Sequence, residues 1–134
     1  MIASFDLTGR RALITGAGSP TGIGFATAAL LGRMGATVHV TATTDRISER
    51  VEQLRAAGIE ATGSVADLTV EDQVQSLPTE VDLLVNNAGM ISVGNSFEDG
   101  SLADMSLATW QAGLRRNLDT AFLVSRHVLP EMAR

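Results

Sequence analysis

Apolar positions along the chain fall into short unbroken runs and longer amphipathic stretches. The short runs are rich in aliphatic and β-branched residues, which is typical of strands buried in a parallel sheet. The longer stretches mix Ala and Leu with charged residues and end near Gly or Pro, as helices do. The pattern predicts strands at 11–15, 37–41, 59–66 and 81–85, and helices at 23–34, 45–57, 70–77 and from 107 toward 134.

Residues 90–105 show neither the apolar runs of buried strands nor the amphipathic pattern of helices, and are predicted to form a loop. Ser106 is placed to cap the last helix, and Pro130 is expected to kink or end that helix late. The alternation of strands and helices predicts an α/β fold of the Rossmann type, a doubly wound parallel sheet. We expect about four strands and four to five helices, with ligands at the carboxyl ends of the strands.

Composition excludes several functional classes. The 134 residues suit one domain, the net charge is −5, and no basic stripe suggests a nucleic-acid partner. The chain has no Cys, which excludes disulfides and thiolate chemistry, and no His, Asp and Glu spacing suggests a metal site. It has no run of 18 apolar residues and no secretory pattern at its start, so we expect a cytoplasmic protein that does not enter membranes.

A glycine-rich turn, T-G-A-G-S-P-T-G-I-G at residues 15–24, lies between the first strand and the first helix. Glycines allow the backbone to approach a pyrophosphate, and the helix N-terminus offers free N–H groups and the positive end of its dipole. Gly16, Gly18 and Gly22 miss the G-x-G-x-x-G spacing by one residue. A tight turn that binds nothing is the alternative, but the flanking strand and helix favour nucleotide binding.

Four features together resemble the short-chain dehydrogenase/reductase family over essentially the whole chain. The turn is similar to the family's T-G-x-x-x-G-x-G, with two extra residues before Gly22. N-N-A-G stands at 86–89, Asp67 follows the third strand, and Asn117 lies in R-R-N-L-D-T-A-F after Trp110. The resemblance implies an NAD(P)-dependent oxidoreductase, closest in look to 3-oxoacyl-carrier-protein reductases, that acts on a small carbonyl or alcohol substrate.

The resemblance also implies roles for single residues. Asp67, with Leu68, would contact adenine, although Asp67 could instead cap a helix. Asn86 is expected to join neighbouring strands, and Asn117 to support a proton relay, which is compatible with a local kink held by its side chain. The cofactor-binding positions implied by the family are Thr15, Gly16, Ser19, Thr21, Gly22, Ile23, Gly24, Asp67, Leu68, Asn87, Ala88 and Gly89.

The choice of nicotinamide cofactor depends on the end of the second strand. Asp45 lies 21 residues beyond Gly24, where a generic rule seeks an acid for NAD. Comparison with the family instead puts that acidic position at Ala42, and makes Asp45 a helix cap. Without an acid at Ala42 a 2′-phosphate is not repelled, and hydrogen bonds from Thr43, Thr44 and Arg46 would favour NADP over NAD.

The family completes its active site with a Ser and a Tyr-x-x-x-Lys pair that lie further along the chain. This chain contains no Tyr and no Lys. Residues 1–134 are therefore expected to be a dinucleotide-binding domain truncated before the catalytic segment, inactive alone, with strand 81–85 at an exposed edge. The family also implies a homotetramer built through the last helix.

A non-catalytic dinucleotide-binding or interaction module is the main alternative function. Another Rossmann-type enzyme, such as a methyltransferase, conflicts with residues 86–89 and with Asn117.

Overall fold

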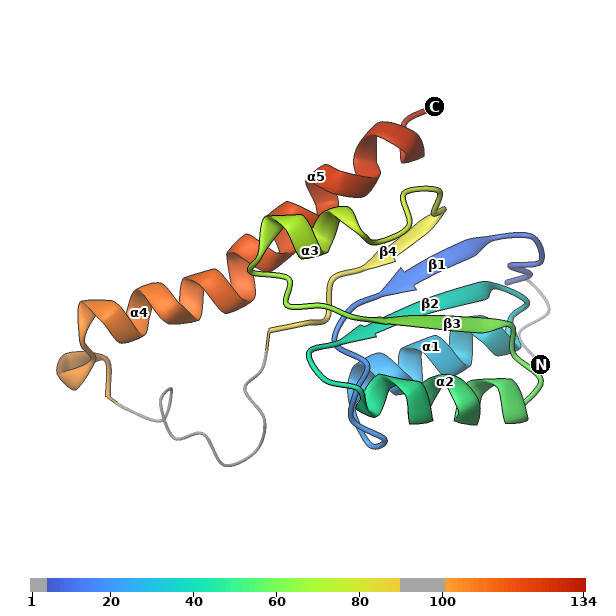
Figure 1. Cartoon of the computed structure of the whole chain (residues 1–134), viewed down its shortest axis with the longest axis horizontal. Coiled ribbons are helices and arrows are strands. Elements are labelled where there is room, and N and C mark those ends of the chain that lie inside the picture. The colour runs from blue at the N-terminus through green and yellow to red at the C-terminus, as the bar shows by residue number, and fades with distance from the viewer. Residues whose placement is uncertain (1–4, 90–100) are drawn as a thin grey trace.

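The structure is a computed structural model, and it describes residues 5–89 and 101–134 (Figure 1). One parallel sheet has the strand order β3-β2-β1-β4. Its strands are β1 (Arg11–Ile14), β2 (Thr37–Ala42), β3 (Ala61–Val65) and β4 (Leu83–Val85). The helices are α1 (Ile23–Arg33), α2 (Arg46–Ala56), α3 (Glu71–Gln75), α4 (Leu107–Leu114) and α5 (Thr120–Met132). The predicted Rossmann-type fold is confirmed.

The strand order reverses between β1 and β4. The chain builds β1, β2 and β3 in one direction and then returns across the sheet to place β4 on the free side of β1. Ala12 is in register with both Val38 of β2 and Leu83 of β4. The loops after β1 and β4 therefore leave the same end of the sheet in opposite directions, and such a switch point is where ligands bind in this architecture.

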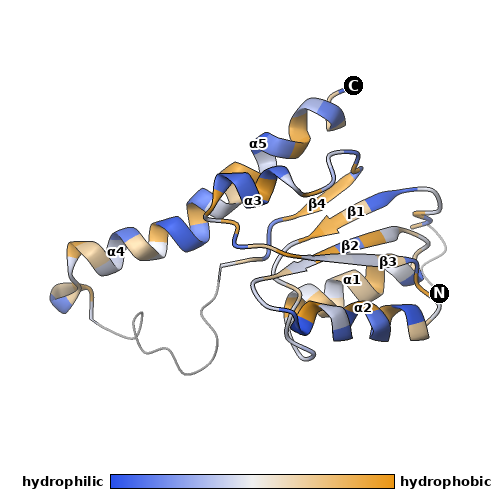
Figure 2. Ribbon diagram, viewed as in Figure 1, coloured by the Kyte–Doolittle hydropathy of each residue, from blue (hydrophilic) through white to orange (hydrophobic). Residues whose placement is uncertain are grey.

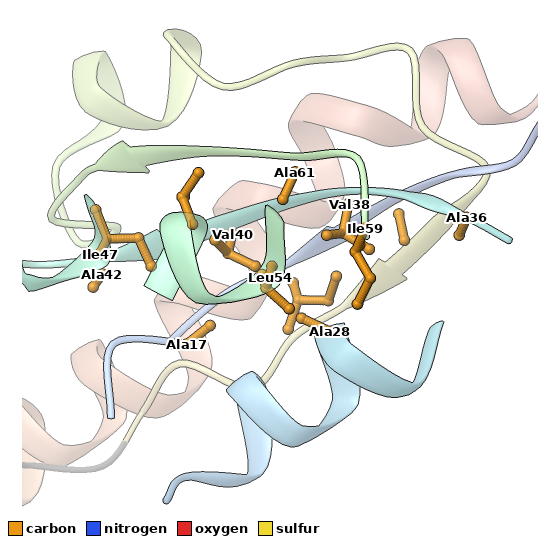
Figure 3. Close-up of a cluster of buried hydrophobic side chains, with 13 residues drawn as sticks. Ala17, Ala28, Ala36, Val38, Val40, Ala42, Ile47, Leu54, Ile59 and Ala61 are labelled. Atoms are coloured by element: carbon orange, nitrogen blue, oxygen red, sulfur yellow. The ribbon is translucent and has the colours of Figure 1, made fainter. Parts of the chain in front are cut away.

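Hydrophobic clusters cover both faces of the sheet. On one face, α1 and α2 pack against β1 and β2 through Ala28, Val40, Leu54 and other small or branched side chains (Figure 3). On the other face, Leu13 packs with residues of α3 and α5, among them Val124, which is fully buried. Figure 2 shows apolar residues along β4 and most of β1, and apolar and polar residues alternating along the helices.

Three strands are shorter than predicted: β1 ends at Ile14, and the residues before β3 and β4 make other contacts. The N–H of Ile59 donates to the carbonyl of Leu54 at 3.0 Å, which closes the end of α2 and delays β3 to Ala61. The carboxylate of Asp82 accepts the N–H of Arg11 at 2.8 Å, so β4 begins only at Leu83. As expected, β4 lies at an edge of the sheet.

The last helix is not one regular helix. A π-helical turn, Arg115–Asp119, separates α4 from α5, and α5 continues past Pro130 to Met132. Ser106 caps α4 as predicted, because its hydroxyl accepts the N–H of Thr109 at 3.1 Å. Within the predicted loop, Leu102–Asp104 forms a 3-10 turn, and residues 90–100 lie outside the described part.

None of the helices that the structure describes is long and apolar enough to cross a membrane.

Candidate functional site

Thr15 joins the loops that follow β1 and β4. The residue is 1% exposed, and its Oγ1 accepts the backbone N–H groups of Asn87 and Ala88, each at 3.0 Å. The same hydroxyl donates to the carbonyl of Val85 at 3.4 Å. One buried hydroxyl therefore satisfies two N–H groups that leave β4, and it fixes the segment 86–89 against the glycine-rich turn.

The side chains of the two asparagines in the segment 86–89 bond to different parts of the fold. The side-chain amide of Asn87 donates to the carbonyls of Thr15 at 3.1 Å and Gly16 at 3.0 Å, so it ties the ends of β1 and β4 together. The amide of Asn86 donates to Oγ of Ser125 on α5 at 3.0 Å. Asn86 thus joins the sheet to a helix, and the expectation that it joins neighbouring strands is wrong.

Three glycines are required by contacts inside the protein. Gly16 has φ of +70°, and a Cβ there would lie 2.7 Å from Cα of Ala88. A Cβ on Gly24 would lie 2.5 Å from Nδ2 of Asn87, and one on Gly89 would lie 2.5 Å from Oδ1 of Asn117. Gly16 therefore lies against the backbone of the segment 86–89, while Gly24 and Gly89 make room for the side chains of Asn87 and Asn117.

The N-terminus of α1 is open to an anion. Gly22 precedes α1, no side chain caps the helix, and no acidic residue stands in its first turn. Gly22 donates its N–H to the carbonyl of Ser19 at 3.2 Å, and the hydroxyls of Ser19 and Thr21 lie 3.5 Å apart beside it. Ile23 is itself 74% exposed. Uncapped N–H groups and the helix dipole make this end suited to a pyrophosphate.

The end of β2 carries a positive charge close to the turn. Thr43, Thr44 and Arg46 are exposed, whereas Ala42 is buried. A Cβ on Gly18 would lie 2.5 Å from Nε of Arg46, so this guanidinium lies directly against the glycine-rich turn. No acidic side chain of the described residues forms a salt bridge with it.

Asp45, predicted to cap the helix after β2, occupies the N-cap position of α2 without making the capping bond. Its carboxylate accepts the hydroxyl of Ser48 at 2.9 Å instead. One oxygen of this exposed carboxylate is therefore bonded within its own helix.

Asp67 folds its carboxylate onto the following turn. Its Oδ1 accepts the N–H of Thr69 at 2.9 Å and the hydroxyl of the same residue at 2.7 Å. Because α3 begins at Glu71 after Val70, Asp67 does not cap that helix. The side chain is exposed and its second oxygen remains available, while the side chain of Leu68 is buried in the core and leaves only its backbone for a ligand.

Asn117 lies within the π-helical turn and holds it. Its Nδ2 donates to the carbonyl of Gly113 at 2.9 Å, and the hydroxyl of Thr120 donates to the carbonyl of Arg116 at 2.6 Å. Side chains thus donate to two carbonyls in and beside the π-helical turn. The predicted side-chain bond of Asn117 is present, whereas the π geometry was not predicted. The proton-relay role of Asn117 stays a prediction.

A further cavity, of about 680 Å³, lies elsewhere among the described residues. It lies at the amino end of the sheet, where Arg10 pairs with Asp82 at 3.2 Å and Arg11 pairs with Glu80 at 2.6 Å. The N–H of Arg11 holds the pKa of the Asp82 carboxyl below its usual range. The charged side chains that line this cavity are paired with one another, and the cavity lies at the opposite end of the sheet from the switch point, so we do not assign the site to it.

The predicted site residues converge at the carboxyl end of the sheet. Within the described part, no group of three His, Asp or Glu side chains could hold a metal ion. The open N-terminus of α1, the exposed arginine beside the turn and the free oxygen of Asp67 supply the donors and acceptor that a dinucleotide requires. The residues present therefore fit such a cofactor.

Comparison with known proteins agrees with this geometry. The family described as short chain dehydrogenase matches residues 10–134. The 2-dehydro-3-deoxy-D-gluconate 5-dehydrogenase of Formosa agariphila is 33% identical over 96% of this chain and 49% of its own length. The 3-oxoacyl-[acyl-carrier-protein] reductase of Pseudomonas aeruginosa is 34% identical over 96% of this chain and 52% of its own.

Solved structures of short-chain dehydrogenases are also similar to this chain. A short-chain type dehydrogenase/reductase from Mycobacterium marinum has a TM-score of 0.82 at 32% identity, covering 96% of this chain and 52% of that one. A metagenomic short-chain oxidoreductase in complex with NADP has a TM-score of 0.79 at 35% identity, covering 94% and 57%. The chain spans about half the length of the relatives it matches. By its sequence, its fold and the geometry of its site, the chain belongs to the short-chain dehydrogenase family.

Proposed function

We propose that this chain is the cofactor-binding part of an NADP(H)-dependent oxidoreductase that interconverts a carbonyl and an alcohol by hydride transfer. The observation that carries the proposal is the pairing of an uncapped helix N-terminus at Gly22 with the exposed guanidinium of Arg46 on the same glycine-rich turn. The first suits a pyrophosphate and the second suits a further phosphate. The NADP-bound metagenomic relative supports this assignment.

Each part of the dinucleotide has a counterpart in the site. The backbone of Ile23 and Gly24 and the hydroxyls of Ser19 and Thr21 would hold the pyrophosphate. The free oxygen of Asp67, with the backbone of Leu68, would receive the adenine amine. The remaining contacts would come from the backbone of Asn87, Ala88 and Gly89 along the ribose, with Thr15, Gly16 and Gly22 shaping the turn.

The proposed preference for NADP over NAD rests on the residues at the end of β2. Ala42 stands where an acid would accept a ribose hydroxyl, and Asp45 is bonded to Ser48. Thr43, Thr44 and Arg46 would donate hydrogen bonds to a 2′-phosphate. Arginine suits this position because its planar guanidinium can bind phosphate oxygens through two N–H groups.

The residues for proton transfer are incomplete in this chain. When bound, the nicotinamide supplies or accepts the hydride, and the reacting oxygen also needs a proton donor or acceptor. The chain contains no Tyr and no Lys. We propose that a Ser and a Tyr-x-x-x-Lys pair from sequence beyond residue 134 complete the site, and that Asn117 positions a water for the relay.

The substrate class and the assembly follow from the same family. We propose a small carbonyl or alcohol substrate, as the names of the gluconate and 3-oxoacyl relatives suggest. We also propose that α4 and α5 pack against further copies of the chain in a homo-oligomer, the family's tetramer. The large exposed apolar side chains on this segment support that arrangement and are Leu107, Trp110, Leu114, Leu118, Phe122 and Leu129.

Calorimetric titration with NADP⁺ and NAD⁺ tests the binding proposal. We expect NADP⁺ to bind about tenfold tighter than NAD⁺, the value of one good charged hydrogen-bonded contact. Equal affinities would contradict the preference, and no binding of either would contradict the site. The 134-residue chain should oxidise no NADPH with a panel of ketones, and turnover by pure material would contradict the missing proton donor.

The intact mass of the purified natural protein tests whether further chain exists. A mass well above 14.0 kDa supports the two-part enzyme. A mass of 14.0 kDa together with NADP⁺ binding would favour a non-catalytic dinucleotide-binding module instead.

A further inference from the structure

Arg50 on α2 is a buried cation that packing alone does not require. The residue is 5% exposed, and its guanidinium lies 5.9 Å from the ring centre of Phe25 on α1. Its acidic partner is the neighbouring Glu49 at 2.7 Å, whose side chain is 75% exposed. The Nε of Arg50 is buried and has no hydrogen-bond partner among the described residues. A buried guanidinium satisfied this poorly is costly, and an apolar residue of similar length would be tolerated.

The guanidinium reaches the glycine-rich turn from the protein interior. Nη1 of Arg50 approaches the carbonyl of Gly18 at 3.4 Å, and that contact is itself buried. The preceding residue, Ala17, donates its N–H to the carbonyl of Thr41 on β2 at 2.8 Å. Gly18 is therefore held from two sides, by the end of β2 and by the first turns of α2.

Arg46 contacts the same glycine from the outside. A Cβ on Gly18 would lie 2.5 Å from Nε of Arg46 and 2.8 Å from Cβ of Ala42, so only glycine lets this side chain lie there. Arg46 and Arg50 are one helical turn apart and share a face of α2. The buried arginine holds the backbone on which the exposed arginine rests.

We propose that Arg50 is a positioning residue for the 2′-phosphate subsite: by holding the Gly18 carbonyl, it fixes the turn against which Arg46 is aligned. This proposal rests on the proposed preference for NADP. Arg50 does not touch the phosphate in this arrangement. It keeps the Gly18 backbone and Arg46 in one geometry before the ligand arrives, which lowers the ordering cost of binding.

The test uses 2′,5′-ADP and 5′-AMP as probes, because they differ only in the 2′-phosphate. We expect the 134-residue chain to bind 2′,5′-ADP about tenfold tighter than 5′-AMP. Arg50→Met keeps the packing on Phe25 and removes the contact with Gly18. It should lower the affinity ratio about fivefold, with 5′-AMP binding unchanged and with Tm lowered by a few degrees at most, because the Gly18 carbonyl loses one donor. Arg33→Met, which removes an exposed arginine from the far end of α1, is the matched control and should change nothing.

Arg50→Lys separates charge from geometry. An ammonium keeps the charge but not the planar donor group, so we expect it to leave the ratio close to that of Arg50→Met. If Arg50→Lys restores the full ratio, charge alone acts and positioning is overturned. If Arg50→Met retains the original ratio, the inference fails while the proposed function stands.

The remaining outcomes separate the two proposals. If Arg50→Met lowers the affinity for both nucleotides alike or fails to fold, Arg50 is structural and the inference is overturned. If the unaltered chain binds both nucleotides equally, the NADP preference itself fails, whatever the variants do.

Discussion

The glycine-rich turn and the α4–α5 segment differ in how far their side chains are packed or bonded within the described chain. At the turn, the small and polar residues have partners within the chain: Thr15 bonds to the segment 86–89, and Gly24 contacts Asn87. On α4, by contrast, no residue is buried, and Trp110 is 49% exposed. Figure 1 shows α4 extending beyond the sheet. The first region is therefore preformed for a small ligand, whereas the second offers an apolar surface that the described chain does not cover.

The largest expected effect is a loss of stability on substitution of Gly24 in the glycine-rich turn. Gly24→Ala would place a Cβ 2.7 Å from the carbonyl oxygen of Gly16, a backbone atom that cannot move without breaking the contact with Asn87. We expect a loss of about 3 kcal/mol of unfolding free energy, as overpacking at a rigid site gives. Urea denaturation measures it.

Gly9→Ala is the control for this change. Gly9 has φ of +79° but nothing near its Cβ position, so the cost there should be about 1 kcal/mol, from backbone strain alone. Equal losses for Gly24→Ala and Gly9→Ala would contradict the close approach at Gly24.

The next largest effect is the loss of stability expected when the hydroxyl of Thr15 is removed. Thr15→Val keeps the shape of the side chain but removes the acceptor of the Ala88 N–H and one of the two acceptors of the Asn87 N–H, which also donates to the carbonyl of Val85 at 3.1 Å. We expect a loss of about 2 kcal/mol in urea denaturation, the cost of a half-buried donor left unsatisfied. Thr43→Val, at an exposed hydroxyl, should stay within about 0.5 kcal/mol of the unaltered chain. A Thr15→Val variant as stable as its parent would show that the two loops do not depend on this hydroxyl.

A smaller effect is expected on the association of copies of the chain through the exposed apolar residues of the α4–α5 segment. Leu118 is 60% exposed on the segment that we propose to contact further copies. Leu118→Gln should raise the dissociation constant of the oligomer about tenfold, the usual value of one apolar interface residue, with little change in the unfolding of the isolated chain. Sedimentation equilibrium measures it. Leu30→Gln, at a 51% exposed leucine of α1, is the control. The same shift from both variants, or from neither, would rule out a specific interface at Leu118.

The features of the fold that the sequence could predict are those fixed by local pattern. Elements fixed by local pattern were predicted closely: the N-terminal boundary of α1 and the cap at Ser106 both hold. The π-helical turn was not predicted, because no apolar or capping pattern in residues 115–119 distinguishes it from a regular helix. The late start of β4 was not predicted because Asp82 meets Arg11, which lies 71 positions away in the chain.

Side-chain environments were less predictable than elements. Arg50 stands in an amphipathic helix where arginine is ordinarily exposed, and no pattern in the sequence marks its burial. The partner of Asn86 lies on a helix 39 positions away in the chain, so its amide could not be assigned from neighbouring residues. The converging set of site residues was predicted by the family motifs, and their individual roles in binding stay predictions.

The smallest expected effect concerns the sheet face on which His39 lies, which belongs to neither region. His39 contacts the hydroxyls of Thr62 and Ser64, each at 2.8 Å, and burial lowers its pKa below the ordinary value. Because the unfolded chain binds the proton more readily, stability should fall as the pH drops below about 6.5 and stay level above it. His39→Gln keeps an amide that can bond to the hydroxyls but cannot titrate. It should flatten the decline in Tm between pH 7.5 and 5.5 by a few degrees at most. An unchanged decline in the variant would mean that groups other than His39 set this pH dependence.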